Sequence, residues 1–320
     1  MIKDDIIVFA LSSSIDLAKE IVGYLDLPLG RCSVKHFADG EIMVEPQESV
    51  RGKRVFIIQS TCRPVSDTIM EVLVCLDACK RASAGEITCV IPYYGYARQD
   101  RKADARQPIT SRLVADLLQT AGADRVVTID LHAPQIQGFF NIPIDDLSCV
   151  SLIGQYFRHK HLKDVVVVSP DHGGATRARK LSVCLNDCPI AIIDKRRTAP
   201  NVAEAMNLIG DVKGKTAIII DDIVDTGGSL CCSVKMLLDM GAKEVYCACT
   251  HGVLSHNAIE RISNSGIKEF VITNTIPLPT DQPKTDNITV LSVGAMLAKV
   301  IEAISNYTPV SDVYDLFNGE

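Results

Sequence analysis

The sequence predicts an α/β fold with two domains, each built on a mainly parallel sheet flanked by helices. Unalternated apolar runs, such as Ile218-Ile219-Ile220, are typical of strands buried on both faces. Segments of helical periodicity alternate with these runs, which favours parallel pairing through crossover helices. With 320 residues the chain exceeds one typical core, so we expect domains at residues 1–148 and 149–320.

Apolar runs in the first half predict strands at residues 6–11, 55–59, 88–93 and 125–129. Apolar residues at helical spacing predict helices at 14–23, 66–84 and 110–122. The Asp39-Gly40 dipeptide within residues 35–45 predicts a hairpin turn between half-buried strands. A long loop is expected at residues 133–146, before the pattern restarts near 147–155.

The second half repeats this alternation. Strands are expected at residues 164–169, 189–193, 217–220, 244–250, 269–273 and 288–291. One helix is expected to begin at Ala175, and another follows the strand at 217–220 and ends at Gly241, a typical helix-terminating glycine. The segment VVTIDLH of the first half resembles IIIDDIVD of the second, which suggests a duplication although the spacings differ.

Composition excludes several classes of protein. The net charge of −6 argues against a nucleic-acid surface, and no run approaches the roughly 18 apolar residues of a membrane span. The N-terminus carries Asp4 and Asp5, unlike a basic signal peptide, so we expect a cytoplasmic protein. Residues 210–216 have one residue too few for a nucleotide-binding P-loop and precede a strand, and no G-x-G-x-x-G follows a strand.

The twelve cysteines include no C-x-x-C pair. Several of them lie within apolar helix or strand patterns. We therefore expect reduced, buried thiols rather than disulfides or a metal cluster.

The most informative stretch follows the strand at 217–220. Asp221 and Asp222 end the apolar run, and a turn of small residues leads into the next helix; these are Asp225, Thr226, Gly227, Gly228 and Ser229. Backbone N–H groups of a glycine turn and a helix N-terminus hold phosphates, and carboxylates accept hydrogen bonds from ribose hydroxyls. The stretch therefore favours a sugar-phosphate site over an ordinary βα turn with acidic residues at a helix start.

Two other polar segments follow predicted strands. Residues 94–102, YGYARQDRK, either bind a ligand at the strand end or form a solvated basic loop. Residues 195–207, KRRTAPNVAEAMN, are expected to form a basic loop that acts as a lid, with a solvated connection as the alternative.

Taken together, the motifs carry a resemblance to known families. Residues 216–229 resemble the phosphoribosyl-diphosphate motif of the type I phosphoribosyltransferases. Over nearly the whole chain, eight motifs in order resemble the ribose-phosphate diphosphokinase family, in its phosphate-activated class. They are FADGE (37–41), QSTCRP (59–64), YGYARQDRK (94–102), DLHAPQIQGFF (130–140), SPDHGG (169–174), DKRR (194–197), DDIVDTGGS (221–229) and TNTIP (273–277).

The resemblance implies two type I phosphoribosyltransferase-like domains and a transferase of nucleotide biosynthesis. The implied reaction moves the β,γ-diphosphate of ATP to the anomeric hydroxyl of ribose 5-phosphate and releases AMP. ATP would contact Phe37, Asp39, Gly40, Glu41, Arg98 and Gln99. Ribose 5-phosphate would contact Asp221 and Asp222 through its hydroxyls, and residues 225–229 through its phosphate. Lys195 and Arg197 would be catalytic.

The family pattern also implies a cofactor, effectors and an assembly. Mg²⁺ would be held by His132 and Asp171, although chemistry alone leaves His132 equally suited to a hydrogen-bonding role beside the metal. His172 is either a diphosphate donor or a packing residue. Phosphate would activate and ADP inhibit at a subunit interface that includes Ser49, Arg51 and Lys102. A homo-oligomer, specifically a hexamer, is implied.

Two other functions share part of the pattern. A phosphoribosyltransferase that consumes the product would share residues 221–229, but it has no need of Phe37 or of Arg98 and Gln99. A non-catalytic regulatory relative is expected to lose the lid cations, whereas this chain retains Lys195, Arg196 and Arg197. The catalytic interpretation is therefore preferred.

Overall fold

The chain divides into two compact units in the computed structural model, which describes residues 5–196 and 205–313. Unit 1 contains residues 5–148, Thr275–Pro277 and 292–313. Unit 2 contains the described residues of 149–274 together with Leu278–Leu291. The segment that follows the last strand of unit 2 therefore belongs to unit 1.

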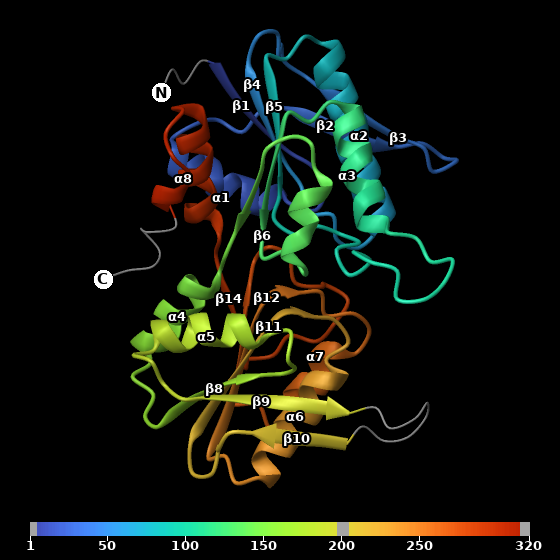
Figure 1. Cartoon of the computed structure of the whole chain (residues 1–320). Coiled ribbons are helices and arrows are strands. Elements are labelled where there is room, and N and C mark those ends of the chain that lie inside the picture. Colours follow the sequence, from blue (N-terminus) through green and yellow to red (C-terminus); the bar gives the residue numbers. More distant parts are fainter. Residues whose placement is uncertain (1–4, 197–204, 314–320) are drawn as a thin grey trace. The chain divides into compact units, whose positions relative to one another are not determined.

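Unit 1 is built on a parallel sheet. Its described strands have the order β1-β4-β5-β6-β7, and every neighbouring pair is parallel. The strands are β1 (Ile6–Ala10), β4 (Arg54–Ile58), β5 (Glu86–Ile91), β6 (Arg125–Ile129) and β7 (Ile144–Leu147). A separate antiparallel ribbon consists of β2 (Cys32–His36) and β3 (Ile42–Pro46). Figure 1 shows this ribbon extending away from the parallel sheet.

Helices pack in pairs in unit 1, and α1 lies beside α8 while α2 lies beside α3 (Figure 1). The helices are α1 (Ile15–Leu25), α2 (Val65–Arg81), α3 (Thr110–Ala121), the short 3-10 helix η2 (Pro134–Phe139) and α8 (Gly294–Ser305). Phe9 and Ile57 share a core with Val72 of α2 and Leu118 of α3. Phe56, the strand neighbour of Ile57, is also buried, so both faces of the sheet are covered.

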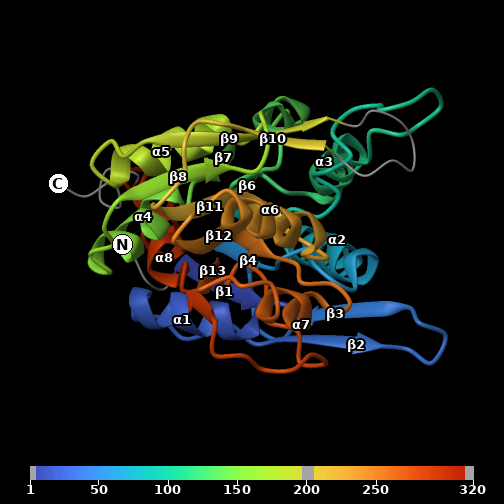
Figure 2. The same ribbon diagram turned by 90° about the horizontal axis from the view of Figure 1, so that it is seen from below.

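Unit 2 has a larger sheet, whose described strands follow the order β10-β9-β8-β11-β12-β13-β14. All neighbours are parallel except the edge pair β9 and β10. The strands are β8 (Val165–Ser169), β9 (Ile190–Arg196), β10 (Ala205–Ile209), β11 (Thr216–Val224), β12 (Glu244–Gly252), β13 (Glu269–Thr273) and β14 (Ile288–Leu291). Figure 2 shows β9 and β10 side by side.

Helices also cover the unit 2 sheet. They are α4 (Val150–His159), α5 (Ala175–Cys184), α6 (Gly228–Asp239) and α7 (Ala258–Ser263). Ile219 of β11 packs in one core with Leu237 of α6 and Ile262 of α7. Ile218 and Ile220 point to the opposite face and are fully buried as well. Burial on both faces explains why the run at 217–220 does not alternate.

The structure confirms the predicted α/β class with mainly parallel sheets flanked by helices, and it corrects three local expectations. The expected loop at 133–146 contains η2 and the start of β7. The expected basic loop at 195–207 begins within β9 and ends within β10. The strand expected at 217–220 extends to Val224, so Asp221 and Asp222 lie within it.

All twelve cysteines are described, and each is a free thiol. Most are buried or half-buried, as expected from the apolar patterns around them, but Cys232 is exposed. The prediction of buried thiols is wrong for this residue. Cys232 lies on the outer side of α6, away from the Leu230, Val234 and Leu237 stripe that packs on the sheet.

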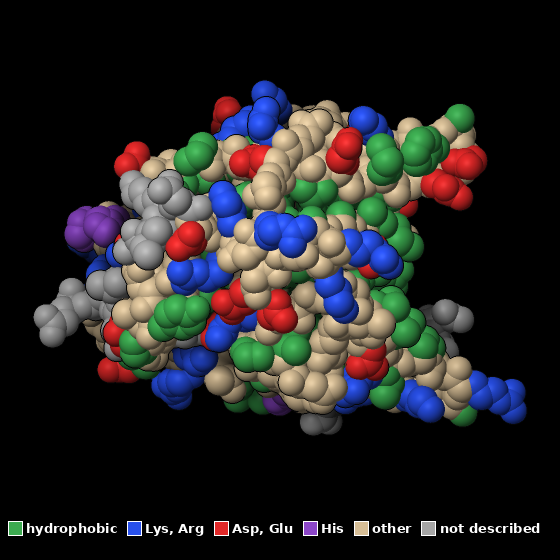
Figure 3. Space-filling model, turned by 90° about the horizontal axis from the view of Figure 1, so that it is seen from above, with side chains coloured by type: hydrophobic (Ala, Val, Ile, Leu, Met, Phe, Trp, Pro, Cys, Tyr) green, Lys and Arg blue, Asp and Glu red, His purple; other side chains and the backbone are tan. Residues whose placement is uncertain are grey.

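The outer surface carries mixed charge. On the face seen in Figure 3, Lys and Arg side chains are interspersed with Asp and Glu side chains, and apolar groups lie between them. None of the helices within the described residues has the length and hydropathy needed to cross a bilayer.

Candidate active site

The strand order of the unit 2 sheet reverses at β8. From β8 the chain adds β9 on one side, then returns to place β11 on the other side and continues to β12 and β13. In open parallel sheets, ligands bind at the carboxyl ends of strands where such a reversal occurs. The loop at residues 170–174 follows β8, and the Asp221–Asp222 pair lies in the carboxyl-terminal half of β11. The topology therefore brings these two predicted segments to the same sheet edge.

Arg177 of α5 links the two segments. Its Nη1 lies 3.5 Å from Oδ1 of Asp221 and 3.2 Å from Oδ1 of Asp222. The backbone N–H of Asp222 donates to Oδ1 of Asp221 at 2.9 Å. Arg177, Asp221 and Asp222 therefore form a compact charged group in which one cation faces two carboxylates.

Burial and mutual repulsion disfavour ionisation of both acids. Burial raises the pKa of Asp221, and the negative charge of Asp222 beside it raises the pKa further, to about 8. Arg177 acts in the opposite direction but does not compensate. The raised pKa favours the protonated form of Asp221 at neutral pH, and the remaining carboxyl oxygens of the pair can accept hydrogen bonds from hydroxyl groups.

The turn between β11 and α6 has the shape of an anion-binding helix start. Gly227, the residue before α6, has φ of 71°, a left-handed conformation that favours glycine. A Cβ atom on Gly227 would lie 3.2 Å from Cγ1 of Ile262. Arg261 donates from Nη1 to the carbonyl of Thr226 at 2.6 Å. These contacts hold the turn at the N-terminus of α6, and the first N–H groups of a helix have no acceptor within the helix itself.

Asp171 and His172 lie in the loop that precedes α5, and both are exposed. Asp171 accepts the backbone N–H of Gly174 through Oδ1 at 2.9 Å. The Nε2 of His172 lies 3.1 Å from Oδ1 of Asp194, which is on β9. His172 is thus held by a carboxylate of the neighbouring strand, a position that leaves its ring able to face a ligand.

The first cations of the segment predicted to form a lid lie on the strand next to the edge of the sheet. Lys195 and Arg196 are the last residues of β9, and their backbones pair with Met206 and Ala205 of β10. Arg197 lies outside the described residues. The edge pair explains why a segment without apolar periodicity still forms strands, because backbone pairing does not need a buried face.

The predicted ATP residues of the first half lie on two features of unit 1. The β2–β3 ribbon ends in a turn where Phe37 donates its N–H to the carbonyl of Glu41 at 2.8 Å. Gly40 has φ of 94°, and Asp39 accepts the N–H of Glu41 at 3.1 Å. Phe37 is 50% exposed, which is unusual for a large apolar ring. The hairpin predicted at 35–45 is confirmed.

The loop after β5 is anchored by buried residues and exposes polar ones. Tyr94 donates to the carbonyl of Ser111 at 2.9 Å, and burial raises the pKa of Tyr94 above its usual value. A Cβ atom on Gly95 would lie 2.4 Å from the carbonyl oxygen of Thr61, so only glycine fits there. Arg98 and Gln99 follow and are both exposed.

The remaining predicted residues of the first half are also exposed. Arg51 donates from Nη1 to Oγ of Ser83 at 3.3 Å, and Ser49 and Lys102 lie at the surface. His132 is exposed in the loop after β6. Within the described ranges, no group of three His, Cys, Asp or Glu side chains is placed to hold a metal ion.

Arg177 and Asp194 were not identified from the sequence. Arg177 lies three residues after Gly174, and its position one turn into the predicted helix was the available signal. Asp194 directly precedes the lid cations. Neither contact could be inferred from spacing alone, because one joins α5 to β11 and the other joins the loop after β8 to β9.

Family models and relatives agree on what the chain resembles. The model described as the N-terminal domain of ribose phosphate pyrophosphokinase matches residues 6–122, and the phosphoribosyl synthetase-associated domain matches residues 164–315. The ribose-phosphate pyrophosphokinase of Bacillus caldolyticus is 58% identical over 307 residues, which cover 96% of this chain and 97% of the relative. The enzyme of the same name from Bacillus subtilis is 56% identical, with 96% of each chain covered.

A solved structure also matches this chain over nearly its full length. The crystal structure of phosphoribosylpyrophosphate synthetase from Mycobacterium smegmatis matches with a TM-score of 0.90 and 43% identity, covering 95% of this chain and 99% of that one. High identity over nearly the full length, together with the order of the motifs, leads to one conclusion. The chain belongs to the ribose-phosphate pyrophosphokinase (diphosphokinase) family.

Proposed function

We propose that this chain transfers the β,γ-diphosphate of ATP to the anomeric hydroxyl of ribose 5-phosphate, giving 5-phosphoribosyl 1-diphosphate and AMP. The observation that carries the proposal is the Asp221–Asp222 pair, which lies on β11 beside the strand-order reversal, in the strand that leads through the turn at residues 225–227 into α6. Carboxylates and a helix N-terminus in succession match the hydroxyls and the phosphate of a sugar phosphate.

In this proposal the ribose 5-phosphate residues act as a unit. Residues 225–229 bind the 5-phosphate through backbone N–H groups and hydroxyls. Asp221 and Asp222 accept hydrogen bonds from the ribose 2- and 3-hydroxyls. Arg177 keeps the two carboxylates oriented, since it lies within ion-pair distance of both.

ATP is proposed to use the exposed residues of unit 1. The half-exposed ring of Phe37 offers a surface for stacking of the adenine base, with Asp39, Gly40 and Glu41 as polar neighbours. Arg98 and Gln99 add polar contacts from the loop after β5. The energy of base–aromatic stacking, about 1–3 kcal/mol, is enough for Phe37 to dominate recognition of the base.

Lys195 and Arg197 are proposed to neutralise the phosphates during transfer. Diphosphoryl transfer depends mainly on positioning and on charge stabilisation, with little covalent work for the protein. Cations on the lid would therefore raise turnover more than they raise the affinity for ribose 5-phosphate.

Mg²⁺ is the proposed cofactor. This ion keeps several waters and usually takes only one or two protein carboxylates in addition to substrate phosphates, so an exposed Asp171 suits it. Bound Mg²⁺ would supply positive charge to the phosphates of ATP. The ligand role of His132 stays a prediction.

Regulation and assembly extend the proposal. We place the chain in the phosphate-activated class, with phosphate and ADP as effectors at Ser49, Arg51 and Lys102, and we propose that it forms a homo-oligomer, specifically a hexamer. The exposed side chains of these three residues would then contact an effector or a neighbouring subunit.

Phosphorus NMR of the purified protein with ATP, ribose 5-phosphate, Mg²⁺ and phosphate tests the reaction. The expected result is AMP together with a new anomeric diphosphate. ADP with a phosphorylated sugar would indicate transfer of a single phosphoryl group and would overturn the proposal. Intact ATP with bound ribose 5-phosphate would instead indicate a regulatory relative.

A further inference from the structure

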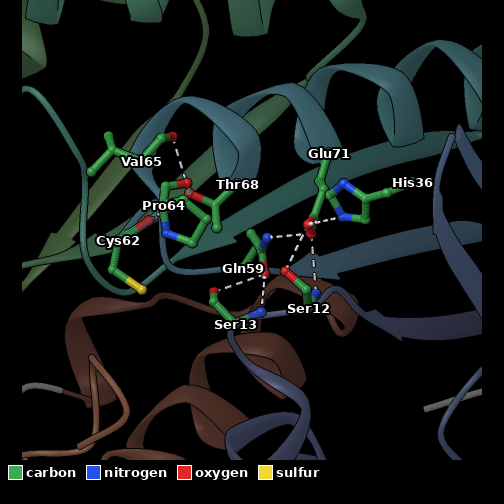
Figure 4. A network of polar contacts seen from close by, with 9 residues as sticks. All are labelled: Ser12, Ser13, His36, Gln59, Cys62, Pro64, Val65, Thr68 and Glu71. Carbon is green, nitrogen blue, oxygen red and sulfur yellow. Dashed lines mark hydrogen bonds and ion pairs between the residues drawn. The ribbon is translucent and has the colours of Figure 1, made fainter. Parts of the chain in front are cut away.

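A buried carboxylate lies beside His36, the last residue of β2 (Figure 4). Glu71 of α2 is only 2% exposed. It accepts the backbone N–H of Ser12 at 3.1 Å and the Ser12 hydroxyl at 2.7 Å, and it accepts Nε2 of Gln59 at 2.7 Å. All three donors are neutral, so they solvate the carboxylate without balancing its charge.

Gln59 holds this carboxylate in one orientation. The side chain of Gln59 is fully buried, and its Oε1 accepts both the N–H of Ser13 at 3.1 Å and the Ser13 hydroxyl at 2.8 Å. The amide nitrogen must then point at Glu71. The network joins the carboxyl ends of β1 and β4 to α2, so Glu71 is attached to the rigid part of unit 1.

His36 brings the ribbon to this network. Among the described side chains, His36 is the only basic group within ion-pair distance of Glu71, with Nε2 3.9 Å from Oε1. This distance exceeds that of a direct hydrogen bond, so the contact is an electrostatic one that is an ion pair only when the imidazole is protonated. His36 is the last residue of β2 and directly precedes Phe37.

The neighbouring strand residue makes a different contact. Lys35 pairs with Glu45 at 3.7 Å on the ribbon itself, and both side chains are more than half exposed. Successive strand residues point to opposite faces, so Lys35 faces away from the side occupied by His36. An exposed pair within the ribbon does not anchor it to the rest of the unit.

We propose that Glu71 is a positioning residue for ATP, which holds the ribbon through His36 and thereby fixes the ring of Phe37. This inference rests on the proposed function, because it assigns the ribbon to ATP. The pairing adds attraction between His36, at the turn end of β2, and a carboxylate held by three hydrogen bonds. Val44 of β3 is buried in the core beside α2, so packing holds the body of the ribbon, and the contact of His36 adds a restraint next to the exposed turn at residues 37–41.

A double-mutant cycle in the full-length protein tests the coupling. His36→Gln and Glu71→Gln should each raise the KM for ATP about threefold to tenfold, and the double variant should be no worse than either one. The kcat and the KM for ribose 5-phosphate should change less than about twofold, because the pair touches neither substrate's reacting atoms. His36→Arg places a permanent cation beside Glu71 and should leave the KM for ATP near the wild-type value.

Matched controls separate positioning from general damage. Lys35→Gln alters the adjacent residue of the same strand, and Asp67→Asn removes an exposed carboxylate from the same helix; both should leave the KM for ATP unchanged. If Glu71→Gln does not fold, as judged by circular dichroism, the exposed His36 variants decide the question. An unchanged KM in His36→Gln, or additive effects in the cycle, would overturn the inference.

Hydrogen exchange provides a readout that does not depend on catalysis. The amides of residues 37–41 should exchange faster in His36→Gln than in the wild type or in Lys35→Gln. Equal exchange in all three would contradict positioning by Glu71. If the wild type forms no AMP, the proposed function fails, and this exchange experiment still tests the attachment of the ribbon.

Discussion

The two units use similar elements but present ligands in different ways. In unit 1, the strands follow β1-β4-β5-β6-β7 without a reversal, and the candidate ligand residues lie on a ribbon outside the sheet and on an exposed loop. In unit 2, the order reverses at β8, and the candidate residues lie at the strand ends themselves. Substitutions in unit 2 should therefore disturb both folding and binding, whereas substitutions at the exposed turn of the ribbon should disturb binding alone.

The largest expected effect comes from the lid of unit 2. Lys195→Ala should lower turnover at least about a hundredfold, because it removes charge stabilisation that is needed mainly in the transition state. The affinity for ribose 5-phosphate should change little. Steady-state AMP formation and calorimetric binding of ribose 5-phosphate measure the two quantities. Lys243→Ala, at the opposite end of the sheet, is the control, and equal losses in both variants would count against a catalytic role.

Phe37 tests the ribbon of unit 1. Phe37→Ala should raise the KM for ATP about tenfold because the stacking of the base is lost. Phe37→Tyr keeps an aromatic ring and should leave the KM for ATP near the wild-type value. The thermal midpoint should not fall, because the ring is half exposed and contributes little to a core. Tyr24→Ala removes another exposed ring of unit 1 and serves as control. A large loss of stability in Phe37→Ala would show that this ring contributes to folding as well as to binding. The contrast between the ribbon of unit 1 and the site of unit 2 would then fail.

The turn of unit 2 should couple stability to binding. Gly227→Ala forces a side chain into a left-handed position near Ile262, which should cost about 1–3 kcal/mol and weaken ribose 5-phosphate binding about tenfold. Gly214 has the same φ of 71° with open space around it. Gly214→Ala should carry backbone strain without loss of affinity. Denaturant unfolding and calorimetry give both numbers, and unchanged affinity in Gly227→Ala would argue against the phosphate role.

The smallest effect concerns the acid pair and depends on pH. The folded state raises the pKa of Asp221 from 3.8 to about 8, so its contribution to the free energy of unfolding falls as pH rises between these values. Asp221→Asn should therefore increase stability relative to wild type by on the order of 1 kcal/mol at about pH 9, and less at about pH 5. Urea unfolding at the two pH values measures this difference in the free energy of unfolding. Asp239→Asn also removes one negative charge and serves as the control for that change. A larger gain at the lower pH would contradict the raised pKa.

Much of the fold could be predicted because local pattern reflects burial. The runs at 6–11 and 217–220 are apolar on consecutive residues since both sheet faces are covered, and Asp39-Gly40 specifies a turn that any ribbon would need. The loop at 195–207 was misjudged for the opposite reason. Its edge strands depend on backbone pairing between β9 and β10, which leaves no apolar period in the sequence.

The site residues divide in the same way. Asp221, Asp222 and Gly227 could be selected because they are neighbours in the chain and form one recognisable stretch. Arg177, Asp194 and the pairing of Glu71 with His36 could not, because each contact joins separate elements. A side chain's partner across a sheet edge depends on strand order and register, which local spacing does not encode.

The sequence by itself determined the fold class and the sugar-phosphate stretch at 221–229 through local periodicity and short-range chemistry, while the other residues proposed to contact substrates follow from the resemblance of its ordered motifs to a known family. Only the tertiary structure decided the reversal of strand order at β8, the grouping of α8 with unit 1 and the partners of the buried carboxylates. The physical reason is that these features depend on long-range packing, in which segments far apart in the chain compete to cover the same apolar surface or to compensate the same charge.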